Sequence, residues 1–299
     1  MKQQADRCGF GGVRWSSEAG YREWRAARLD GIPASVEEIT IEIGGLTDLE
    51  DTARARILAC CRRSNMAIYA CRDAMADMAA IRTFAASFGL LRLDHHLCAT
   101  DDGVTEVTAA SGGMRAGYVP YSRRSLSWHT DGYYNAASRR VRAVVLHCAN
   151  DAASGGTIAL LDPEIAYIRL RDANPAFIEA FEHPACMTIP ANVAAGGEIR
   201  PTVSGPVFSH DHASGALHMR YSARRKNIRW RDDTTTAAAR ECLAELLADE
   251  SGPLLRYRLR PGQGLICNNV LHKRTAYADR PGQRRLLYRA RFFDRVNSS

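Results

Sequence analysis

Short apolar runs separated by turn residues fill most of the chain from about residue 105 onward. Each run has the length and the β-branched or aromatic content of a strand rather than of a helix. Two longer stretches with helical spacing, 163–182 and 234–248, interrupt the series. Many short strands with few helices predict a barrel or a sandwich that carries helices on its outside. The expected strands are 141–148, 157–161, 185–189, 217–221, 254–259, 264–270 and 286–293.

The N-terminal part of the chain has a different, mostly helical pattern. Apolar residues recur at three- and four-residue intervals over 48–63 and again over 73–88, which predicts two helices. Between them, 66–69 (MAIY) predicts a short buried strand. No repeat, low-complexity tract or Pro/Gly/Ser linker divides the 299 residues. We therefore expect one domain over 1–299, with a helical part at about 1–65 and a β-rich core with helical insertions at about 66–299.

The charged residues of the chain restrict the classes of molecule that it is expected to bind. There are 40 Lys and Arg against 33 Asp and Glu, a net charge of +7. The basic residues are almost all arginines and are scattered along the chain, which does not favour nucleic acid as a partner. The lysines, Lys2, Lys226 and Lys273, all lie outside a G-x-x-x-x-G-K-[ST] pattern. This excludes a P-loop nucleotide site.

The sequence also contains no pattern typical of a membrane span, a secretory signal or a redox-active cysteine pair. No apolar run approaches the about 20 residues that cross a bilayer, and residues 1–25 lack the apolar segment of a secretory signal. The nine cysteines contain no C-x-x-C pair, so neither a zinc ribbon nor a thioredoxin-type pair is indicated. We expect a cytoplasmic protein with reduced thiols and no membrane partner.

The most informative segment is 127–132 (SWHTDG). On an extended chain, His129 and Asp131 lie two positions apart and point to the same side. An imidazole and a carboxylate, joined by a second imidazole, form the 2-His-1-carboxylate set of non-heme Fe(II) oxygenases. Taken alone, the His-x-Asp triplet is equally compatible with a surface turn closed by Asp131 and Gly132.

The C-terminal segment supplies the missing groups. An apolar strand at 264–270 leads to His272, and a turn near 281–282 leads to a further strand with Arg285 and Arg289. Because they are four positions apart, the two arginines face the same way on a strand. A guanidinium group holds a carboxylate in bidentate fashion. Metal ligands and an anion clamp on neighbouring strands form a coherent candidate site.

Over about residues 68–295 the chain resembles the Fe(II)/2-oxoglutarate-dependent dioxygenases of the taurine dioxygenase type. The resemblance rests on 128–131 (WHTD), on 154–157 (SGGT) and on the segment 272–289 with its arginines. It implies an α+β, mainly β fold: a double-stranded β-helix (jelly-roll, cupin-like) core with flanking helices. It also implies Fe(II) as cofactor, 2-oxoglutarate and O2 as co-substrates, and oxidation of a small molecule with release of succinate and CO2.

The resemblance assigns the iron ligands, by motif match, to His129, Asp131 and His272. In related halogenases a small residue replaces the carboxylate. Because Asp131 is present, the resemblance favours hydroxylation or another oxidation over halogenation.

The same match assigns the co-substrate residues. Arg285 corresponds to the arginine that pairs with the distal carboxylate of 2-oxoglutarate, and Thr157 to the threonine that hydrogen-bonds that carboxylate. Arg289 corresponds to a second arginine, close to the co-substrate or to an anionic substrate. Taurine dioxygenase has an extra residue before its threonine and a slightly shorter loop after its second histidine. Taurine is therefore not assumed to be the substrate.

Residues near the ligand pair are candidates for substrate contact. The loop that follows Asp131 should approach the iron, and a later strand carries further polar side chains. We expect a small anionic or amino-acid-like substrate, and we leave open whether the chain forms a homo-oligomer. For Arg220, Arg224 and Arg225, recognition of a substrate anion and a place on an arginine-rich surface are equally compatible with the sequence. The candidates are Tyr133, Tyr134, Asn135, His218 and Arg220.

Two alternatives remain at this point. The same machinery could act on a nucleobase or a macromolecule, which the charge of +7 permits. The chain could instead be a non-catalytic, cupin-like binding protein that holds a ligand through His210 and His212, which form a rival His-x-His pair.

Overall fold

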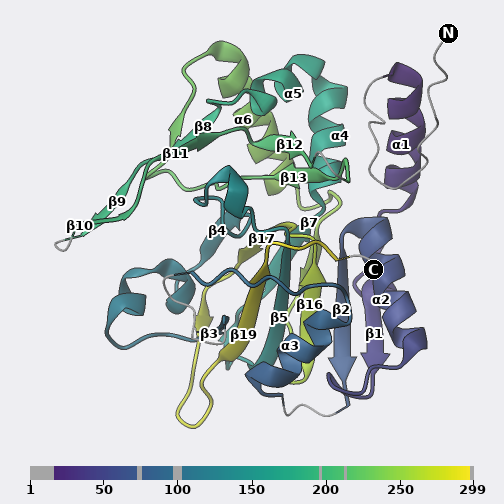
Figure 1. Ribbon diagram of the computed structural model, residues 1–299, viewed down its shortest axis with the longest axis vertical. Coiled ribbons are helices and arrows are strands. Elements are labelled where there is room, and N and C mark those ends of the chain that lie inside the picture. Colours follow the sequence, from purple (N-terminus) through teal and green to yellow (C-terminus); the bar gives the residue numbers. More distant parts are fainter. Residues whose placement is uncertain (1–16, 73–75, 97–102, 195–196, 212–213, 297–299) are drawn as a thin grey trace.

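Two β-sheets packed face to face form the core of the protein (Figure 1). The computed structural model describes residues 17–72, 76–96, 103–194, 197–211 and 214–296. The larger sheet has six strands in the order β1-β2-β16-β5-β19-β3, and the smaller has four in the order β15-β7-β17-β4. Neighbours in both sheets are antiparallel except β1 and β2, which are parallel. The strands are β1 (Thr40–Ile43), β2 (Met66–Cys71), β3 (Val104–Val107), β4 (Leu126–His129), β5 (Ala143–Asn150), β7 (Ile158–Leu161), β15 (Leu255–Tyr257), β16 (Gln263–Cys267), β17 (Leu271–Arg274) and β19 (Leu286–Phe292).

Central strands of both sheets are buried on both faces. On β7, Ile158 and Leu160 pack in the apolar cluster between the two sheets. Ala159 and Leu161 point the other way and pack against helices. The alternation follows from the two-residue period of a strand. Burial on both faces explains why these strands appear in the sequence as nearly continuous apolar runs.

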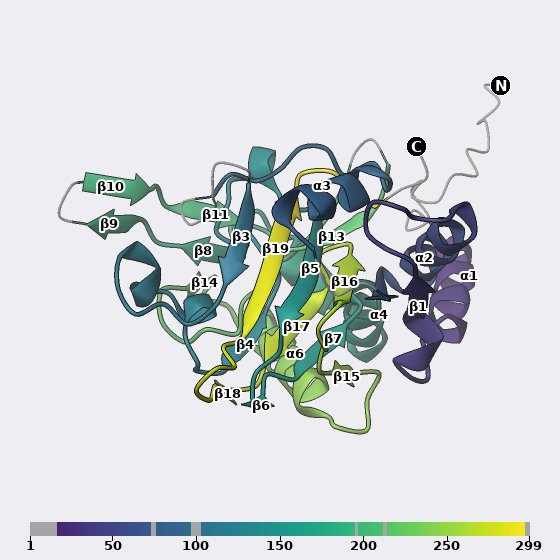
Figure 2. The same cartoon turned by 90° about the horizontal axis from the view of Figure 1, so that it is seen from below.

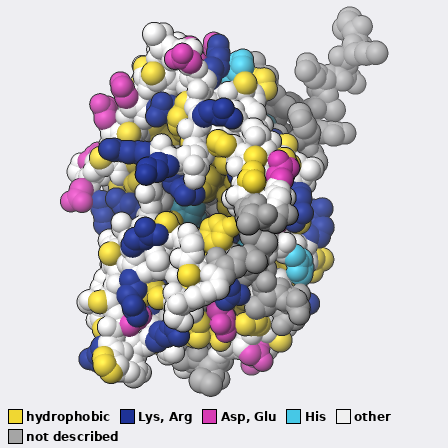
Figure 3. All heavy atoms as spheres, turned by 90° about the vertical axis from the view of Figure 1, so that its left-hand side faces the viewer, with side chains coloured by type: hydrophobic (Ala, Val, Ile, Leu, Met, Phe, Trp, Pro, Cys, Tyr) yellow, Lys and Arg dark blue, Asp and Glu magenta, His cyan; other side chains and the backbone are white. Residues whose placement is uncertain are grey.

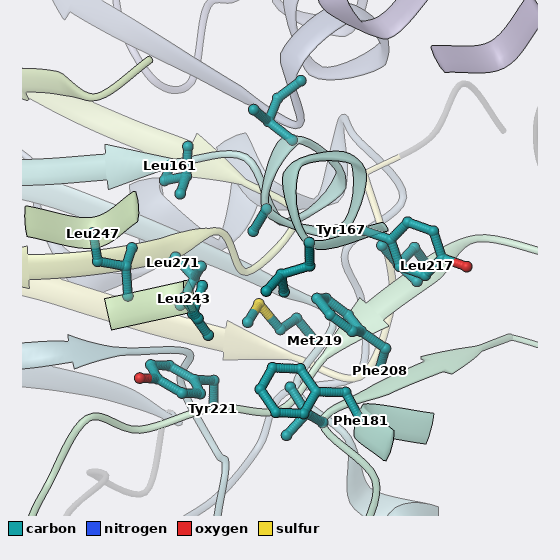
Figure 4. Packing of buried hydrophobic residues seen from close by; sticks show 14 of the residues in the cluster. Leu161, Tyr167, Phe181, Phe208, Leu217, Met219, Tyr221, Leu243, Leu247 and Leu271 are labelled. Atoms are coloured by element: carbon teal, nitrogen blue, oxygen red, sulfur yellow. The ribbon is translucent and has the colours of Figure 1, made fainter. Parts of the chain in front are cut away.

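Helices cover the outer face of each sheet (Figure 2). Helices α2 (Asp51–Ser64) and α3 (Met78–Ala86) pack on the six-stranded sheet. Helices α4 (Pro163–Ala173), α5 (Pro175–Glu182) and α6 (Thr234–Ala248) pack on the four-stranded sheet. Figure 4 shows this second cluster, in which Leu271 of β17 lies among Tyr167 of α4, Phe181 of α5 and Leu243 of α6. Helix α1 (Glu18–Asp30) joins it through Trp24, whose ring packs edge-on against Tyr167.

The remaining elements are short. The β9–β10 hairpin projects from the body of the molecule (Figure 1). In the described part of the chain, no helix combines the length and the apolar character that a membrane span requires. The short strands are β6 (Ser154–Gly155), β8 (Met187–Ile189), β9 (Asn192–Ala194), β10 (Gly197–Arg200), β11 (Val203–Gly205), β12 (Phe208–His210), β13 (Leu217–Met219), β14 (Arg229–Trp230) and β18 (Tyr277–Ala278), and the 3-10 turns are η1 (Glu37–Ile39), η2 (Met114–Gly117), η3 (Val119–Tyr121) and η4 (Ala137–Arg139).

The expected jelly-roll core with flanking helices is confirmed, with two local differences. The stretch 163–182 forms two helices because Asn174, which precedes Pro175, is extended and caps the second helix. The N-terminal part up to about residue 65, expected to be helical, also contributes the edge strand β1. This strand has only four residues and pairs with β2 across the intervening helix α2, so its partner is set by tertiary packing.

Candidate metal and co-substrate site

Two histidines and one aspartate converge between the sheets. His129 ends β4 and lies directly opposite His272 of β17, and Asp131 follows two residues after His129. The ligand atoms of the three side chains lie within 4.8 Å of one another. Among the described residues, no other group of three or more His, Cys, Asp or Glu side chains converges in this way. The sequence-predicted triad is therefore assembled in space.

Both histidines present the same ring nitrogen to the centre of the triad. Nδ1 of His129 lies 2.9 Å from the carbonyl oxygen of Ser127, and Nδ1 of His272 lies 2.9 Å from that of Val270. Because a carbonyl only accepts, each Nδ1 donates, which leaves Nε2 of each ring as the atom that can bind a metal ion. Burial, together with the neighbouring His272, lowers the pKa of His129 to about 3. His129 is therefore neutral at physiological pH, the form that binds a metal ion.

Asp131 is kept ionised by arginines of the opposite sheet. Burial alone would raise the pKa of Asp131. The positive charges of Arg289 and then Arg291 lower it by more, so that the pKa lies well below the usual range. Nη1 of Arg289 donates to Oδ1 at 3.1 Å and contacts Oδ2 at 3.4 Å. The pair is buried, with 8% of Arg289 and 5% of Asp131 exposed. A carboxylate in this state needs no proton loss before it binds a cation.

The arginine predicted to bind 2-oxoglutarate is also buried. Arg285 directly precedes β19 and is 5% exposed, and its Nη1 finds no hydrogen-bond acceptor among the described residues. A small pocket borders Arg285, Gly155 and Gly156. A buried guanidinium with an unpaired donor beside a pocket fits the carboxylate of a dicarboxylic acid.

Two glycines lie beside this pocket. A Cβ at Gly155 would lie 2.1 Å from the carbonyl oxygen of Ala276, so only glycine allows β6 to approach β18. A Cβ at Gly156 would lie 3.6 Å from Nε of Arg285 and would occupy space beside the guanidinium. Thr157 follows, partly buried, and its backbone N–H donates to Oγ1 of Thr275 at 3.1 Å.

Two tyrosines lie next to the triad. The ring of Tyr133 packs edge-on against His129, with 6.4 Å between the ring centroids, and its hydroxyl accepts from Nη1 of Arg224 at 2.8 Å. The guanidinium of Arg200 lies 5.9 Å from the ring centroid of Tyr134. Figure 3 shows a recess in one face of the molecule, with Lys and Arg side chains around it and a histidine at its floor. Aromatic rings and guanidinium groups therefore lie together beside His129.

Three of the five substrate candidates, Asn135, His218 and Arg220, make contacts other than those of the two tyrosines. Nδ2 of Asn135 donates to the carbonyl of Arg139 at 2.9 Å, within its own loop. His218 lies on β13, opposite Ser209 of β12. Burial, together with Arg140 and other arginines, lowers the pKa of His218 to about 3. No contact between His218 and the metal triad occurs in the described part of the chain.

Arg220 has a structural role in this protein. Its guanidinium uses four of its five N–H groups on backbone carbonyls, at distances between 2.8 and 3.1 Å. These contacts tie the loop that carries Tyr133 to β8 and β11. A guanidinium engaged in this way has no free fork for a substrate anion, so the sequence-based expectation for Arg220 is not carried forward. The acceptors are the carbonyls of Tyr133, Met187, Gly205 and Val203.

Sequence reasoning missed Arg291 and Asp94. Arg291 is 2% exposed, donates to the hydroxyl of Tyr134 at 2.8 Å, and pairs with Asp94. Its position two residues after Arg289 on a strand was the available signal, because the two side chains must share a face.

His210, the described member of the rival His-x-His pair, does not belong to the triad. His210 lies at the end of β12, and its Nε2 is 3.3 Å from Oε1 of Glu182. His212 lies outside the described residues.

A family model agrees with the geometry of the site. The model for taurine catabolism dioxygenases, the TauD/TfdA family, matches residues 36–291. The chain belongs to this family. As a TauD/TfdA-family protein it is a dioxygenase that depends on Fe(II) and uses 2-oxoglutarate and O2 as co-substrates. The family expected from the motifs is thereby confirmed.

Several proteins are similar to this TauD/TfdA-family chain. A uridine-5'-phosphate dioxygenase from an Amycolatopsis species is 29% identical over 177 residues, which are 58% of this chain and only 62% of that relative. The structure of an asparagine oxygenase with Fe(II), 2S,3S-3-hydroxyasparagine and succinate matches with a TM-score of 0.57 at 16% identity, covering 92% of each chain. A taurine dioxygenase from Burkholderia xenovorans matches with a TM-score of 0.57 at 18% identity, over 87% of this chain and 89% of that one. The two structures share its fold.

Proposed function

We propose that this dioxygenase hydroxylates a small phosphorylated substrate, with nucleoside monophosphates as the first candidates. The observation that carries the proposal is the position of Tyr133 beside the metal triad, where it contacts both His129 and Arg224. Arginine is well suited to phosphate, because its planar fork matches two phosphate oxygens. The relative named as a uridine-5'-phosphate dioxygenase supports the same substrate class.

His129, Asp131 and His272 would hold the iron. The two Nε2 lone pairs and the ionised carboxylate offer three ligands on one side of a metal ion, which leaves the other positions for co-substrates. Fe(II), when bound, supplies the chemistry by which O2 and 2-oxoglutarate are converted to succinate and CO2 while the substrate is oxidised. The surrounding apolar cluster limits the access of water to this centre.

Arg285 would bind the distal carboxylate of 2-oxoglutarate, with Thr157 beside it. The unpaired Nη1 of Arg285 supplies the donor, and Gly156 places no side chain beside the guanidinium. Arg289 has a different position, because it already contacts Asp131. It would keep the carboxylate ionised before the metal binds and would contribute positive charge next to the bound co-substrate or the substrate.

The tyrosines and the outer arginines would hold the substrate. The rings of Tyr133 and Tyr134 pack against each other with 5.2 Å between their centroids and offer an aromatic surface for a planar base. Arg224 donates to the hydroxyl of Tyr133, Arg200 lies beside the ring of Tyr134, and both supply positive charge for a phosphate. An amino-acid substrate offers the arginines a carboxylate but gives the tyrosines no planar partner.

The proposed substrate class is tested by measuring the rate of succinate release in the presence of Fe(II), O2 and 2-oxoglutarate. Uridine 5'-monophosphate and other nucleoside monophosphates should stimulate release, whereas uridine, asparagine and taurine should not. Stimulation by uridine or by asparagine equal to that by the nucleotides would contradict the proposal, because neither carries a phosphate.

A matched pair of variants tests whether Arg224 binds the phosphate of the substrate. Arg224→Met should raise the KM of the phosphorylated substrate by about tenfold or more, since a charge-assisted hydrogen bond contributes about 1.5–3 kcal/mol. Arg225→Met removes the neighbouring exposed arginine and should leave KM unchanged. Equal effects of the two changes would indicate only a loss of general positive charge.

The ligand assignment is tested by metal titration of the apoprotein. His272→Ala should lose Fe(II) binding and succinate formation, whereas His210→Ala should keep both, because His210 contacts Glu182 instead. The opposite result would support the cupin-like binding protein that uses His210.

A further inference from the structure

We propose that Asn269 is a positioning residue of the iron site, which holds the backbone of Asp131 so that the carboxylate meets the two histidines. The inference rests on the proposed role of Asp131 as a ligand. Asn269 lies in the turn between β16 and β17, three residues before His272. It is 3% exposed and does not itself reach the metal triad as a ligand.

The side chain of Asn269 binds both backbone polar groups of Asp131. Its Oδ1 accepts from the backbone N–H of Asp131 at 2.8 Å, and its Nδ2 donates to the carbonyl of Asp131 at 2.9 Å. The same Nδ2 donates to the carbonyl of Val141 at 2.6 Å. The amide therefore pairs with Asp131 as a strand neighbour would, at a point where β4 has already ended.

Only an asparagine combines the needed shape and donors at this position. The φ of Asn269 is 50°, in the left-handed region that asparagine tolerates better than most residues. The three hydrogen bonds use one acceptor and both N–H donors of the amide. An aspartate of the same shape would keep the acceptor, lose both donors and place a charge against two carbonyl oxygens.

The segment held by Asn269 is also tightly packed. Gly132 has a φ of 67°, and a Cβ there would lie 2.5 Å from Cγ2 of Val141. Val141 therefore contacts Gly132 through its side chain and Asn269 through its carbonyl. The turn that leads to the ligand His272 thus also holds the chain at the ligand Asp131. Such outer contacts orient metal ligands before the metal arrives.

The neighbouring Asn268 provides a matched control. It is also buried, and its Nδ2 donates to Oδ1 of Asn65 at 3.1 Å while its Oδ1 accepts from the backbone N–H of Val296 at 3.0 Å. Its side chain makes no hydrogen bond to the segment 129–132 within the described structure. Changing either asparagine removes buried hydrogen bonds, but only Asn269 contacts the ligand segment.

The test is anaerobic titration of the full-length apoprotein with Fe(II), alongside urea unfolding of each variant. Asn269→Gly accommodates the left-handed φ and removes only the amide, so it should fold and bind Fe(II) about 10- to 100-fold more weakly. Asn269→Asp should weaken binding to a similar or greater degree. Asn268→Ala should lower the stability and leave the Fe(II) affinity within about twofold of the unchanged protein, a limit set well below that expected loss.

Each outcome decides the inference. Wild-type Fe(II) affinity in Asn269→Gly, or an equal loss of affinity in Asn268→Ala, overturns the positioning role. Asp131→Ala in the same titration separates this failure from that of the ligand assignment. If Asp131→Ala binds Fe(II) normally, the proposed ligand set is wrong. If Asp131→Ala loses Fe(II) while Asn269→Gly keeps it, only the role of Asn269 fails.

Discussion

Arg289 of one sheet contacts both carboxylate oxygens of Asp131 at the edge of the other, at 3.1 and 3.4 Å, across 158 positions of the sequence. Each member of this buried pair neutralises the other while no metal ion is bound. A divalent cation at the triad would take over part of that neutralisation. The pair therefore links the stability of the apoprotein to the affinity of the site for metal.

Arg289→Met should lower the free energy of unfolding of the apoprotein by about 3–5 kcal/mol, because it removes the one arginine that pairs directly with the buried carboxylate of Asp131 in the described structure. Metal should offset much of this loss, so the rise in Tm on adding Mn(II) should exceed that of the unchanged protein. Thermal unfolding with and without Mn(II) measures both effects. An equal rise in Tm would show that Arg289 does not balance the charge of Asp131.

Arg285→Gln should raise the KM for 2-oxoglutarate by about 10- to 100-fold, because a hydrogen bond to a charged group contributes about 1.5–3 kcal/mol. The Fe(II) affinity should not change, since Arg285 does not contact the triad. Initial rates of succinate formation against 2-oxoglutarate concentration measure the effect. Arg284→Gln, at the exposed neighbouring position, is the control and should keep the original KM.

Arg220→Met should lower the free energy of unfolding by at least about 3 kcal/mol, because four backbone carbonyls lose their donor in a buried place. Urea unfolding measures the loss. The preference for a phosphorylated over an unphosphorylated substrate should stay as it is. A variant with normal stability and a lost preference would return Arg220 to the substrate site.

His218 should make stability depend on pH. Burial, and after it Arg140, lowers the pKa of His218 in the folded protein to about 3, against about 6.5 in the unfolded chain. Between these pH values the unfolded chain binds more protons than the folded protein. The stability that the neutral, buried His218 contributes to folding is therefore complete above about pH 6.5 and is lost as the pH falls towards 3. Its slope is at most about 1.4 kcal/mol per pH unit.

His218→Asn should therefore flatten the dependence of unfolding free energy on pH below about 6.5. Urea unfolding of the apoprotein at pH 7 and at pH 5 measures the slope. Parallel curves for the two proteins would mean that His218 titrates alike in the folded and unfolded states.

Much of the β-rich core could be predicted because its signals are local. The helix predicted at 234–248 is observed as α6 with the same bounds, capped by the side chain of Asp233. The strand predicted at 286–293 is observed as β19. Strand pairing could not be predicted, because it depends on contacts across long separations. β16 lies between β2 and β5, far from both in sequence, and β1 is a strand only because β2 pairs with it.

The candidate site divides in the same way. The sequence by itself determined the ligand types and their order, because the two-residue period of a strand places His129 and Asp131 on one side and a later strand delivers His272. Only the tertiary structure decided which arginines are free and which are used. Arg285 keeps a donor for a ligand, while Arg220 gives four donors to backbone carbonyls. Nor does the sequence distinguish Asn269 from Asn268, because hydrogen-bond partners come from segments that only folding brings together.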